Sequence, residues 1–445
     1  METPTKLLSL LSIASETIRK HDFIHIYSHY DADGISAAGI LSKALHRDGR
    51  EFCVTLFPVL NDENMTIIEK DRSKCIILSD IGSSYLDRLD ALDKDVIVLD
   101  HHRTPRDSEK ICFINPHMFG SDGANECCGS SLAYMLAMEL SGNNTDLVQI
   151  ALAGIVGDKQ HLRGMKGINV KILNDGVRNG HVKVTEGSLI PSGNLSRELY
   201  LSSEPYISGV SGNSKGVSGL LFTAGISNDR MFHDLNENEQ RKLSSMIALR
   251  LLSKNVSTDT MIETLETRYQ LLSWGMDAET FSKMLDACGR QDLGSIGVGL
   301  CLGDQRCRTE AERLNDDYRN KVVDAAKELD EKGLIRTKNI QYFDSSESGF
   351  TGVLCGIAMS FFGDRDKPTI GINASENIAK ASARGTRELI EKGLDLSIAM
   401  GAAAKEVEGE GGGHDIASGA SFPSDAKEKF IALLDGIVGE QIAAK

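Results

Sequence analysis

Residues 95–102 read DVIVLDHH, an apolar run that ends in Asp100, His101 and His102. A short run rich in Val and Ile is typical of a strand that is buried on both faces. An acidic and imidazole-bearing segment directly after such a strand lies at the carboxyl edge of the sheet, where open α/β proteins bind their ligands. The stretch therefore predicts a mostly parallel α/β sheet with a polar site at its edge.

A second apolar run ends in the same kind of residues. Residues 24–34 read IHIYSHYDADG, so that His29, Asp31 and Asp33 come directly after a strand-like run. The glycine at position 34 lets the backbone approach a ligand closely. Two carboxylates that are two residues apart in such a turn can face one pocket. The segment therefore predicts a second contribution to the same polar site.

Two more carboxylates complete the pattern. Asp80 closes the apolar run of residues 75–79, and Asp158 follows the apolar segment 151–157, which we expect to be helical. Carboxylates and imidazoles that converge on one edge repel one another unless cations neutralise them. Mixed imidazole and carboxylate ligation favours manganese, with Mg²⁺ as the alternative, over structural zinc. We therefore expect two Mn²⁺ ions with Asp80 bridging them, an arrangement suited to in-line displacement at phosphorus.

The composition limits the class of protein. The chain has 445 residues, 41% of them hydrophobic and 25% charged, which is typical of a globular protein with two or three domains. Its net charge of −15 weighs against an extended duplex binder, because Lys and Arg neutralise phosphates. The nine cysteines show no CxxC pair, which favours reduced thiols in a cytoplasmic protein. No apolar run approaches the ~20 residues that span a membrane, and residues 7–18 favour an amphipathic helix over a signal peptide.

The alternation of strand-like and helical segments predicts the fold class. We expect an α/β protein of two lobes: an N-terminal, mostly parallel sheet with flanking helices, and a smaller C-terminal α/β domain, joined by a helical connector. The expected boundaries are residues 1–186, 187–290 and 291–445. In the last segment the apolar runs at residues 296–302 and 340–343 alternate with helical patterns, which predicts strands.

The C-terminal segment carries a second group of polar residues. Residues 409–415 read GEGGGHD, and residues 381–385 read ASARG. A glycine run that ends in histidine can form a backbone nest for phosphate oxygens. The guanidinium of Arg384 offers a bidentate partner to the same phosphate, and Ser382 adds a hydroxyl donor. Taken alone, this pattern is explained more simply by a flexible turn beside a surface arginine.

The order of these motifs resembles the DHH phosphoesterase superfamily. Residues 29–34 resemble its first motif, Asp80 its second, residues 100–102 its third and Asp158 its fourth. The glycine run and the segment around Arg384 resemble the motifs of its associated C-terminal domain. The amino-acid sequence of the first motif looks most like that of RecJ-type single-strand exonucleases, especially the archaeal RecJ-like proteins.

The resemblance implies roles for individual residues. The metal ligands would be His29, Asp31, Asp33, Asp80, His101 and Asp158. His102 would contact the phosphate, and Asp100 would be either a ligand or a support for the histidines; these two form the catalytic pair. The substrate phosphate would be gripped in the second lobe by Ser382, Arg384, Gly411, Gly412, Gly413 and His414.

Three functions follow from the pattern and the resemblance. The first is a Mn²⁺-dependent phosphodiesterase that releases mononucleotides from single-stranded DNA or RNA by two-metal hydrolysis. The second is hydrolysis of very short oligonucleotides or cyclic dinucleotides, which the acidic net charge and the lack of an added oligonucleotide-binding fold favour. The third is a replication component that binds a GINS-type partner and has a subordinate nuclease activity. A membrane partner is not expected.

Overall fold

The chain forms two compact units, each built from two separate segments. The computed structural model describes residues 4–104, 106–265, 267–346 and 349–443. The first unit combines Met1–Gly187 with Glu266–Asp317, and the second combines Ser188–Leu265 with Tyr318–Lys445. The sequence predicts three consecutive segments instead, divided after residues 186 and 290. The difference arises because Glu266–Asp317 packs back onto the first unit, through contacts between segments far apart in the sequence.

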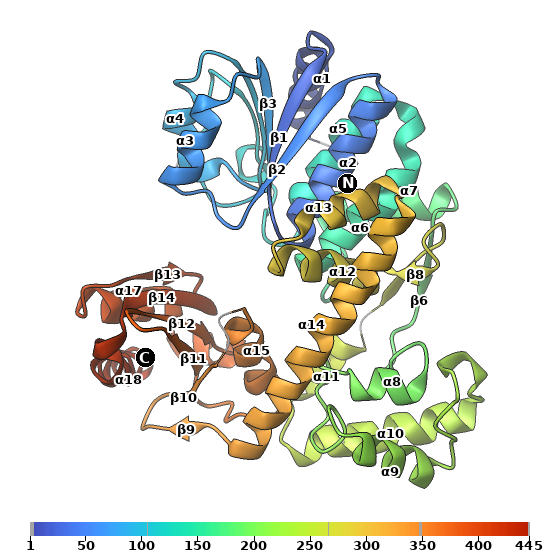
Figure 1. Cartoon of the computed structure of the whole chain (residues 1–445), viewed down its shortest axis with the longest axis vertical. Helices are drawn as coiled ribbons and strands as arrows, with labels where there is room; N and C mark the ends of the chain where they lie inside the picture. The colour runs from blue at the N-terminus through green and yellow to red at the C-terminus, as the bar shows by residue number, and fades with distance from the viewer. Residues whose placement is uncertain (1–3, 105, 266, 347–348, 444–445) are drawn as a thin grey trace. The chain divides into compact units, whose positions relative to one another are not determined.

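A five-stranded parallel sheet forms the centre of the first unit, with the spatial order β2-β1-β3-β4-β5 (Figure 1). Its strands are β1 (Phe23–His29), β2 (Glu51–Phe57), β3 (Cys75–Ser79), β4 (Asp95–Leu99) and β5 (Cys112–Ile114). Strands β1, β3 and β4 coincide with the apolar runs that the sequence analysis reads as strands. In this order the chain leaves β1 toward β2 and leaves β3 in the opposite direction toward β4, so that a topological switch point lies between β1 and β3.

Helices cover both faces of this sheet, which explains why its strands are continuous apolar runs. Ile24, Ile26 and Ile77 face one hydrophobic core, and Tyr27 and Leu78 face the other. The first core is closed by α1 (Thr5–Arg19), α2 (Ala32–Arg47), α5 (Gly129–Leu140), α6 (Val148–Gly157) and α7 (Gly167–Arg178). The second is closed by α3 (Asp62–Lys70), α4 (Leu86–Leu89) and the 3-10 turn η1 (Ser83–Tyr85). Two further 3-10 segments are η2 (Pro116–Phe119) and η3 (Gly142–Leu147).

A strand from the end of the predicted N-terminal domain, part of the predicted connector and the start of the predicted C-terminal domain complete the first unit. The added elements are β6 (Val182–Thr185), β7 (Arg268–Leu271), β8 (Met276–Asp277), α12 (Ala278–Arg290), α13 (Gly294–Leu302) and the first part of α14 (Gln305–Lys332). The three strands form a small antiparallel sheet, and α12 and α13 pack on α2. The predicted strand at residues 296–302 is wrong, since this run lies within α13. Gly297 lies between Ile35 and Cys288, so other helices enclose this run. A run that is enclosed in this way is apolar throughout, and its hydrophobic periodicity does not distinguish a helix from a strand.

A six-stranded mixed sheet with the order β13-β14-β12-β11-β10-β9 lies at the centre of the second unit (Figure 1). Its strands are β9 (Ile335–Arg336), β10 (Gln341–Asp344), β11 (Thr369–Ala374), β12 (Ile378–Arg384), β13 (Glu410–Gly413) and β14 (Ala417–Pro423). Helix α15 (Thr351–Phe361) packs on one face. Helices α17 (Leu396–Lys405) and α18 (Lys427–Ala443) pack on the other. The predicted fold class, with an N-terminal parallel sheet and a C-terminal α/β part, is confirmed.

Shorter helices of the second unit pack around the later part of α14. They are α8 (Leu195–Tyr200), α9 (Ser214–Ala224), η4 (Phe232–Asp234), α10 (Glu237–Ser253) and α11 (Thr258–Thr264), and near the C-terminal sheet lie α16 (Arg387–Glu391) and η5 (Ser424–Ala426). Among the described residues, none of the helices combines the length and the apolar character that crossing a bilayer requires.

Candidate metal centre

Four segments bring polar side chains to the carboxyl edge of the parallel sheet. His29 ends β1, Asp80 follows β3, and Asp100 follows β4. Asp158 arrives from the helical layer, as the residue that caps the C-terminus of α6. The site thus lies at the switch point between β1 and β3, where the strand order leaves room for a ligand. All four segments that the sequence singles out meet there.

The start of α2 fixes the two carboxylates of the DADG segment. Asp31 is the N-cap, and its Oδ1 accepts a hydrogen bond of 3.0 Å from the backbone N–H of Gly34. The helix begins at Ala32, so Asp33 lies in its first turn and is buried. Gly34 is required, because a Cβ at this position would stand 2.4 Å from the carbonyl oxygen of His29. The two carboxylates therefore enter the site at different depths.

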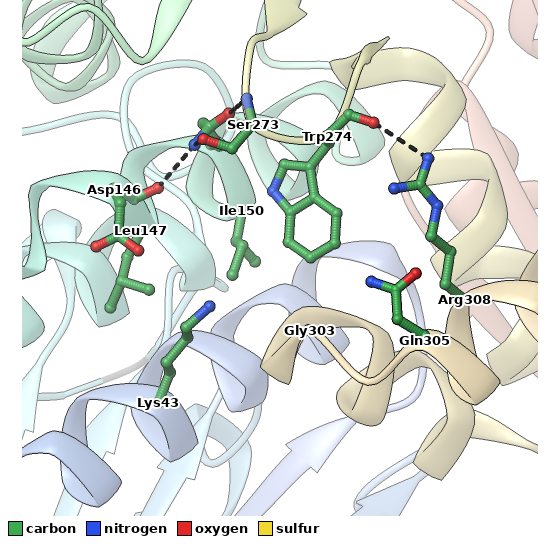
Figure 2. Close-up of a pocket in the computed structure, with 10 residues that line it drawn as sticks. Lys43, Asp146, Leu147, Ile150, Ser273, Trp274, Gly303, Gln305 and Arg308 are labelled. Atoms are coloured by element: carbon green, nitrogen blue, oxygen red, sulfur yellow. Dashed lines mark hydrogen bonds between the residues drawn. The ribbon is translucent and has the colours of Figure 1, made fainter.

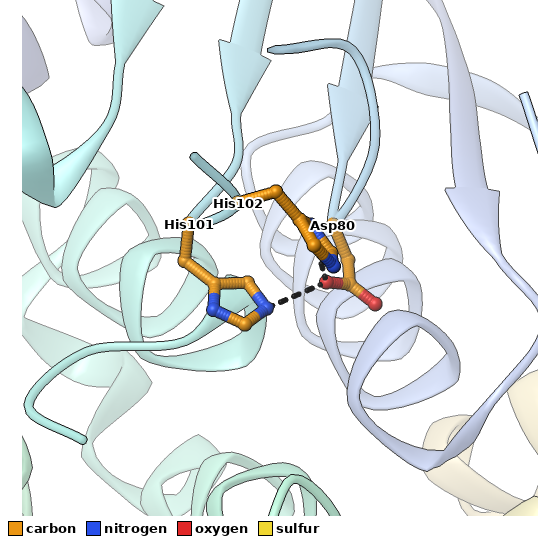
Figure 3. Close-up of side chains that lie close together, drawn as sticks. All are labelled: Asp80, His101 and His102. Atoms are coloured by element: carbon orange, nitrogen blue, oxygen red, sulfur yellow. Dashed lines mark hydrogen bonds and ion pairs between the residues drawn. The ribbon is translucent and has the colours of Figure 1, made fainter. Parts of the chain in front are cut away.

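Asp80 lies at the middle of the site. Its Oδ1 is 3.1 Å from Nε2 of His101 and 4.0 Å from Nδ1 of His102. Figure 3 shows these three side chains together. Its Oδ2 is 3.5 Å from Nδ1 of His29. Burial alone would raise the pKa of the Asp80 carboxyl, but the hydrogen bonds to His101 and His29 outweigh it and hold that pKa well below its ordinary value. Asp80 is therefore a fixed anion that two sides of the site share.

The backbone at Asp80 has an unusual conformation. Its φ is 59°, in the left-handed region that only Gly, Asn and Asp adopt readily. The start of α5 lies directly against it, since a Cβ on Gly129 would stand 2.8 Å from Cβ of Asp80. The left-handed turn at the end of β3 thus aims the carboxylate into the site, and a glycine on the neighbouring helix leaves space for it.

Asp33 is held by the N-terminus of α5. Its Oδ2 accepts 2.7 Å from the N–H of Gly129, and its Oδ1 accepts 3.0 Å from the N–H of Ser130. The thiol of Cys128 also lies 3.0 Å from Oδ1. A helix N-terminus offers free N–H groups and a positive dipole end, both of which favour a carboxylate. Burial and the nearby charge of Asp80 nevertheless raise the pKa of Asp33 to about 6.

The two ligand-type histidines are oriented by backbone carbonyls. Nδ1 of His101 lies 2.7 Å from the carbonyl oxygen of Gly123, so this nitrogen carries the proton, and Nε2 faces the carboxylates. In His29 the roles are reversed, because Nε2 faces the carbonyl oxygen of Pro58 at 3.2 Å and Nδ1 faces Asp31 at 3.0 Å. Burial opposes a charge on His29, but hydrogen bonds to the acids raise its pKa to about 11.

His102 and Asp100 form a pair at the rim of the site. Nδ1 of His102 donates to Oδ1 of Asp100 at 2.8 Å, and the buried Asp100 also accepts 2.8 Å from the N–H of Ser83. Burial works against both charges, yet this hydrogen bond raises the pKa of His102 to about 9 and lowers that of Asp100 to about 2. The side chain of His102 is 51% exposed. It is therefore a protonated imidazole that faces outward, with Asp100 as its support.

The fourth carboxylate, Asp158, faces the same imidazole as Asp33. Its Oδ2 is 3.9 Å from Nε2 of His101, which is 4.0 Å from Oδ2 of Asp33. Burial and the proximity of Asp33 and Asp80 raise the pKa of Asp158 to about 8, against the opposing effect of His101. The site therefore brings together more carboxylates than its histidines can neutralise, which favours a cation there.

The donor set fits a pair of divalent cations. His29, Asp31 and Asp80 each offer an atom within 4.8 Å of the others, and so do Asp80, His101 and His102. The two groups share Asp80. The donors are carboxylate oxygens and imidazole nitrogens, a mixture that suits manganese better than structural zinc. A third group, Asp33 with Cys128 and Asp158, lies on the side of His101.

Several residues of the site carry no signal in the sequence. Cys128 and Gln160 lie against Asp33 and Asp158, respectively, but neither belongs to a recognisable motif. Asp286 of α12 is close enough for the charges of Asp31 and His29 to shift its pKa, which burial raises. The sequence assigns α12 to a connector, and only the folding back of that segment shows its proximity to the site.

In the second unit, β12 carries two of the predicted substrate-binding residues. Ala381 and Ala383 face the core under α17 and α18, so the alternation of the strand places Ser382 and Arg384 on the opposite face. There both side chains approach the start of α15, because a Cβ on Gly352 would stand 3.2 Å from a guanidinium nitrogen of Arg384 and 3.6 Å from the hydroxyl of Ser382. They therefore share one face of the sheet.

The glycine run does not form the predicted nest. Gly411, Gly412 and Gly413 lie in β13, the exposed edge strand, where their backbone groups pair with β14. Pairing to a strand reached through a hairpin is a non-local contact that a glycine-rich pattern does not reveal. Gly412 pairs with Gly419, which pairs with Ser382, so a strip without bulky side chains crosses the sheet. His414 lies in the turn that follows, where its backbone N–H donates to the carbonyl oxygen of Ala417. Ala417 in turn pairs with Arg384 of β12.

A separate pocket of about 210 Å³ lies elsewhere in the first unit (Figure 2). Lys43 of α2 points into it from one side, and Trp274 and Gln305 line the other. Lys43 is ten residues further along α2 than Asp33, a separation of ~15 Å at 1.5 Å per residue. The pocket is thus distinct from the carboxylate and imidazole site.

The structure defines a two-unit α/β protein with an acid- and histidine-lined site at the edge of a parallel sheet. Family models match both units: the N-terminal domain of the DHH family over residues 23–155, and the DHHA1 domain over residues 337–440. The chain belongs to the DHH family. An uncharacterised protein of Methanocaldococcus jannaschii, MJ0831, is 32% identical over 97% of this chain and 96% of its own length.

Two solved structures share the fold. RecJ from Thermus thermophilus, in complex with Mn²⁺, matches 99% of this chain with a TM-score of 0.62 and 16% identity. This chain covers 55% of that RecJ. CDC45 from Entamoeba histolytica matches 98% of this chain and 99% of its own length, with a TM-score of 0.65 and 13% identity. Family, fold and donor set together support a phosphoesterase that binds divalent metal.

Proposed function

We propose that the protein is a Mn²⁺-dependent phosphodiesterase that removes mononucleotides from single-stranded DNA or RNA. The observation that supports this most directly is Asp80, a buried anion that both donor groups share. A shared carboxylate is what two closely spaced divalent cations require. Every metal-binding position that the family pattern implies is also filled, which favours an active enzyme over an inactive scaffold.

The distances suggest which side chains would hold each of the two ions. His29, Asp31 and Asp80 would hold one ion. Asp33, Asp80, His101 and Asp158 would hold the other, since Nε2 of His101 lies within 4.0 Å of all three of these carboxylates. Two such ions would supply positive charge to the phosphate oxygens and would lower the pKa of bound water toward neutrality.

The chain's own residues contribute charge and a proton at the rim. His102 is protonated at neutral pH, because Asp100 holds its pKa at about 9. With Nδ1 bonded to Asp100, its Nε2–H is left to donate to a phosphate oxygen or to the leaving oxygen. Asp100 is buried and also tied to the N–H of Ser83, so it fixes the ring in one orientation. Asp100 acts as the positioning residue, and His102 touches the substrate.

The second unit would bind the strand through its phosphates. The strip at Gly412 and Gly419 has no side chains and would let a nucleic-acid backbone lie close to the sheet. Ser382 lies at the end of the strip, and Arg384 lies two residues further along β12. His414 stands at the same end of the sheet. These contacts serve any phosphodiester, so they fit DNA and RNA alike.

Arg384→Ala is expected to weaken substrate binding and to leave the chemical step nearly intact. A charged hydrogen bond is worth ~1.5–3 kcal/mol, which predicts a KM about 10- to 150-fold higher with kcat changed less than about 3-fold. Steady-state kinetics on a fluorescent single strand measures both. Arg387→Ala, an exposed arginine three residues away, is the control and should change neither. A loss confined to kcat would assign Arg384 to the chemistry instead.

Mn²⁺ is expected to stabilise the protein against heat. A ligand at 100 times its Kd adds ~2.7 kcal/mol per site, and ~1 kcal/mol shifts the melting temperature of a domain of 150–250 residues by ~2–4 °C. The melting temperature of the first unit should therefore rise by about 5–10 °C per ion, and EDTA should reverse this rise. Differential scanning calorimetry with and without Mn²⁺ measures this. An unchanged transition would contradict the proposed metal centre.

Hydrolysis of end-labelled single strands tests the function itself. Strands of about five and about forty nucleotides, as DNA and as RNA, are incubated with Mn²⁺ or with EDTA. Release of mononucleotides from the long strand in Mn²⁺ alone supports the exonuclease. Cleavage of only the short strand supports the alternative of a short-oligonucleotide or cyclic-dinucleotide phosphodiesterase. The GINS-type partner stays a further proposal, and co-purification with such a complex would test it.

A further inference from the structure

A buried amide touches Asp158 and the backbone carbonyl that orients His101. Nε2 of Gln160 donates 2.8 Å to Oδ2 of Asp158 and 2.8 Å to the carbonyl oxygen of Gly123. The same carbonyl accepts from Nδ1 of His101 at 2.7 Å. Gln160 is only 2% exposed. One side-chain amide thus connects Asp158 with the carbonyl that orients His101.

The chain of hydrogen bonds continues from Gln160 to the helix that holds Asp33. Nδ2 of Asn169 donates 2.8 Å to Oε1 of Gln160, and the hydroxyl of Ser131 donates 2.6 Å to Oδ1 of Asn169. The hydroxyl of Ser131 accepts from the N–H of Cys128 at 3.3 Å, at the N-terminus of α5. Asn169 and Ser131 are fully buried. We call Gln160, Asn169 and Ser131 the amide relay.

The relay has only one consistent direction. If the amide of Gln160 were flipped, its oxygen would face the carbonyl oxygen of Gly123, which can only accept. A flipped Asn169 would place its oxygen against the oxygen of Gln160. Each donor therefore points from α5 toward Asp158, and both amides of the relay donate as well as accept. Buried hydrogen-bond networks of this kind hold their members in one geometry.

We propose that Gln160, supported by Asn169, is a positioning residue that holds Asp158 and His101 in place for a divalent cation. This inference rests on the proposed function. Asp158 needs such a support, because it stands at the C-cap of α6, is 30% exposed, and is followed by Lys159 with a φ of 56°. The relay connects Asp158 to the N-terminus of α5, which binds Asp33. Asp33, His101 and Asp158 therefore keep a fixed spacing as proposed metal ligands.

The test is a titration of the full-length protein with Mn²⁺ alone. The electron paramagnetic resonance signal of free Mn²⁺ at each step gives the Mn²⁺ affinity. Loss of an outer partner of a metal ligand typically weakens metal affinity 10- to 100-fold, and we expect that range for Gln160→Leu. Saturating Mn²⁺ should restore most of the activity, since Gln160 touches neither substrate nor ion. Gln160→Glu keeps the shape but loses at least one donor, and should weaken binding in the same direction if the Leu variant folds poorly.

Asn169→Leu tests whether the effect passes along the relay. It should weaken Mn²⁺ binding less than Gln160→Leu does, because Gln160 keeps both of its own donor bonds. The double variant should bind no more weakly than Gln160→Leu alone, since the two changes interrupt one path. Additive losses in the double variant would mean that the two amides act independently and would overturn the relay.

Gln149→Leu is the matched control. Gln149 is a buried amide near the start of α6, the helix that Asp158 caps, and it bonds Ser273 and the carbonyl of Asp146 beside the separate pocket. Its loss should lower the melting temperature without changing Mn²⁺ affinity. Equal Mn²⁺ affinities for Gln160→Leu, Gln149→Leu and the wild type would overturn the inference and leave the proposed function standing. A wild type that binds no Mn²⁺ would instead overturn the proposed function.

Discussion

Asp80→Asn is expected to reduce Mn²⁺-dependent hydrolysis on the order of 10³-fold or more. Asparagine fits the left-handed backbone at this position, so the turn after β3 should keep its shape. What disappears is the charge that both donor groups share, and with it the favourable interaction with His29 and His101. Removal of one group that stabilises a transition state commonly reduces the rate ~10²–10³-fold, and here one change acts on two proposed ions.

Single-turnover hydrolysis of a labelled forty-nucleotide strand measures this loss, with far-ultraviolet circular dichroism to confirm folding. Asp146→Asn is the control. Asp146 is also a carboxylate of the first unit, but it forms a bidentate pair with Arg47 away from the site. Its loss should leave hydrolysis within about 3-fold of the wild type. Activity of Asp80→Asn within 10-fold of the wild type would refute the assignment of Asp80 as the shared ligand.

Asp158→Asn is expected to have opposite effects on stability and on function. Folding raises the pKa of Asp158 from 3.8 to about 8. A group whose pKa is raised on folding contributes stability that is fully present below its unfolded pKa, and that is lost as the pH rises through its folded pKa. In the metal-free protein this contribution therefore disappears between about pH 4 and pH 8. Asparagine avoids the loss, because it brings no charge into the site.

Thermal denaturation in EDTA at pH 5 and pH 9 checks the sign. The variant should melt on the order of 2–6 °C above the wild type at pH 9, and the difference should be smaller at pH 5. In Mn²⁺ the order should reverse, because the wild type gains a ligand that the variant binds poorly. Hydrolysis should fall at least about 100-fold. A variant that is less stable than the wild type in EDTA at pH 9 would show that the carboxylate contributes to the fold.

The edge of the parallel sheet could be predicted because its signals are local. The apolar runs that end in His29, Asp80 and Asp100 each occupy fewer than twelve consecutive residues, and the helix before Asp158 is equally continuous. Parallel strands align their carboxyl ends, so the three segments that follow strands meet by topology, and Asp158 joins them from the helical layer. The resemblance to the DHH superfamily depends on the same local motifs, and it is confirmed.

What the sequence does not reveal depends on partners far along the chain. Residues 296–302 are an apolar run with glycines, and only their enclosure by α2 and α12 makes them helical. The glycines of β13 read as a loop until β14 pairs with them. Gln160 and Asn169 are ordinary polar residues, whose importance appears only when Ser131, 38 positions before Asn169, is seen beside it. Long-range pairing of this kind leaves no pattern in one sequence.

The left-handed turn at Asp80 also has an evolutionary consequence. Asparagine is reached from aspartate by a single nucleotide change, and both residues accept this backbone conformation. A descendant of such a protein could therefore lose its shared carboxylate in one step and still fold. Every surface outside the site would then remain available to selection for other purposes, such as binding a partner. The backbone geometry that aims the carboxylate thus allows catalysis to be lost by a single substitution while the fold is retained.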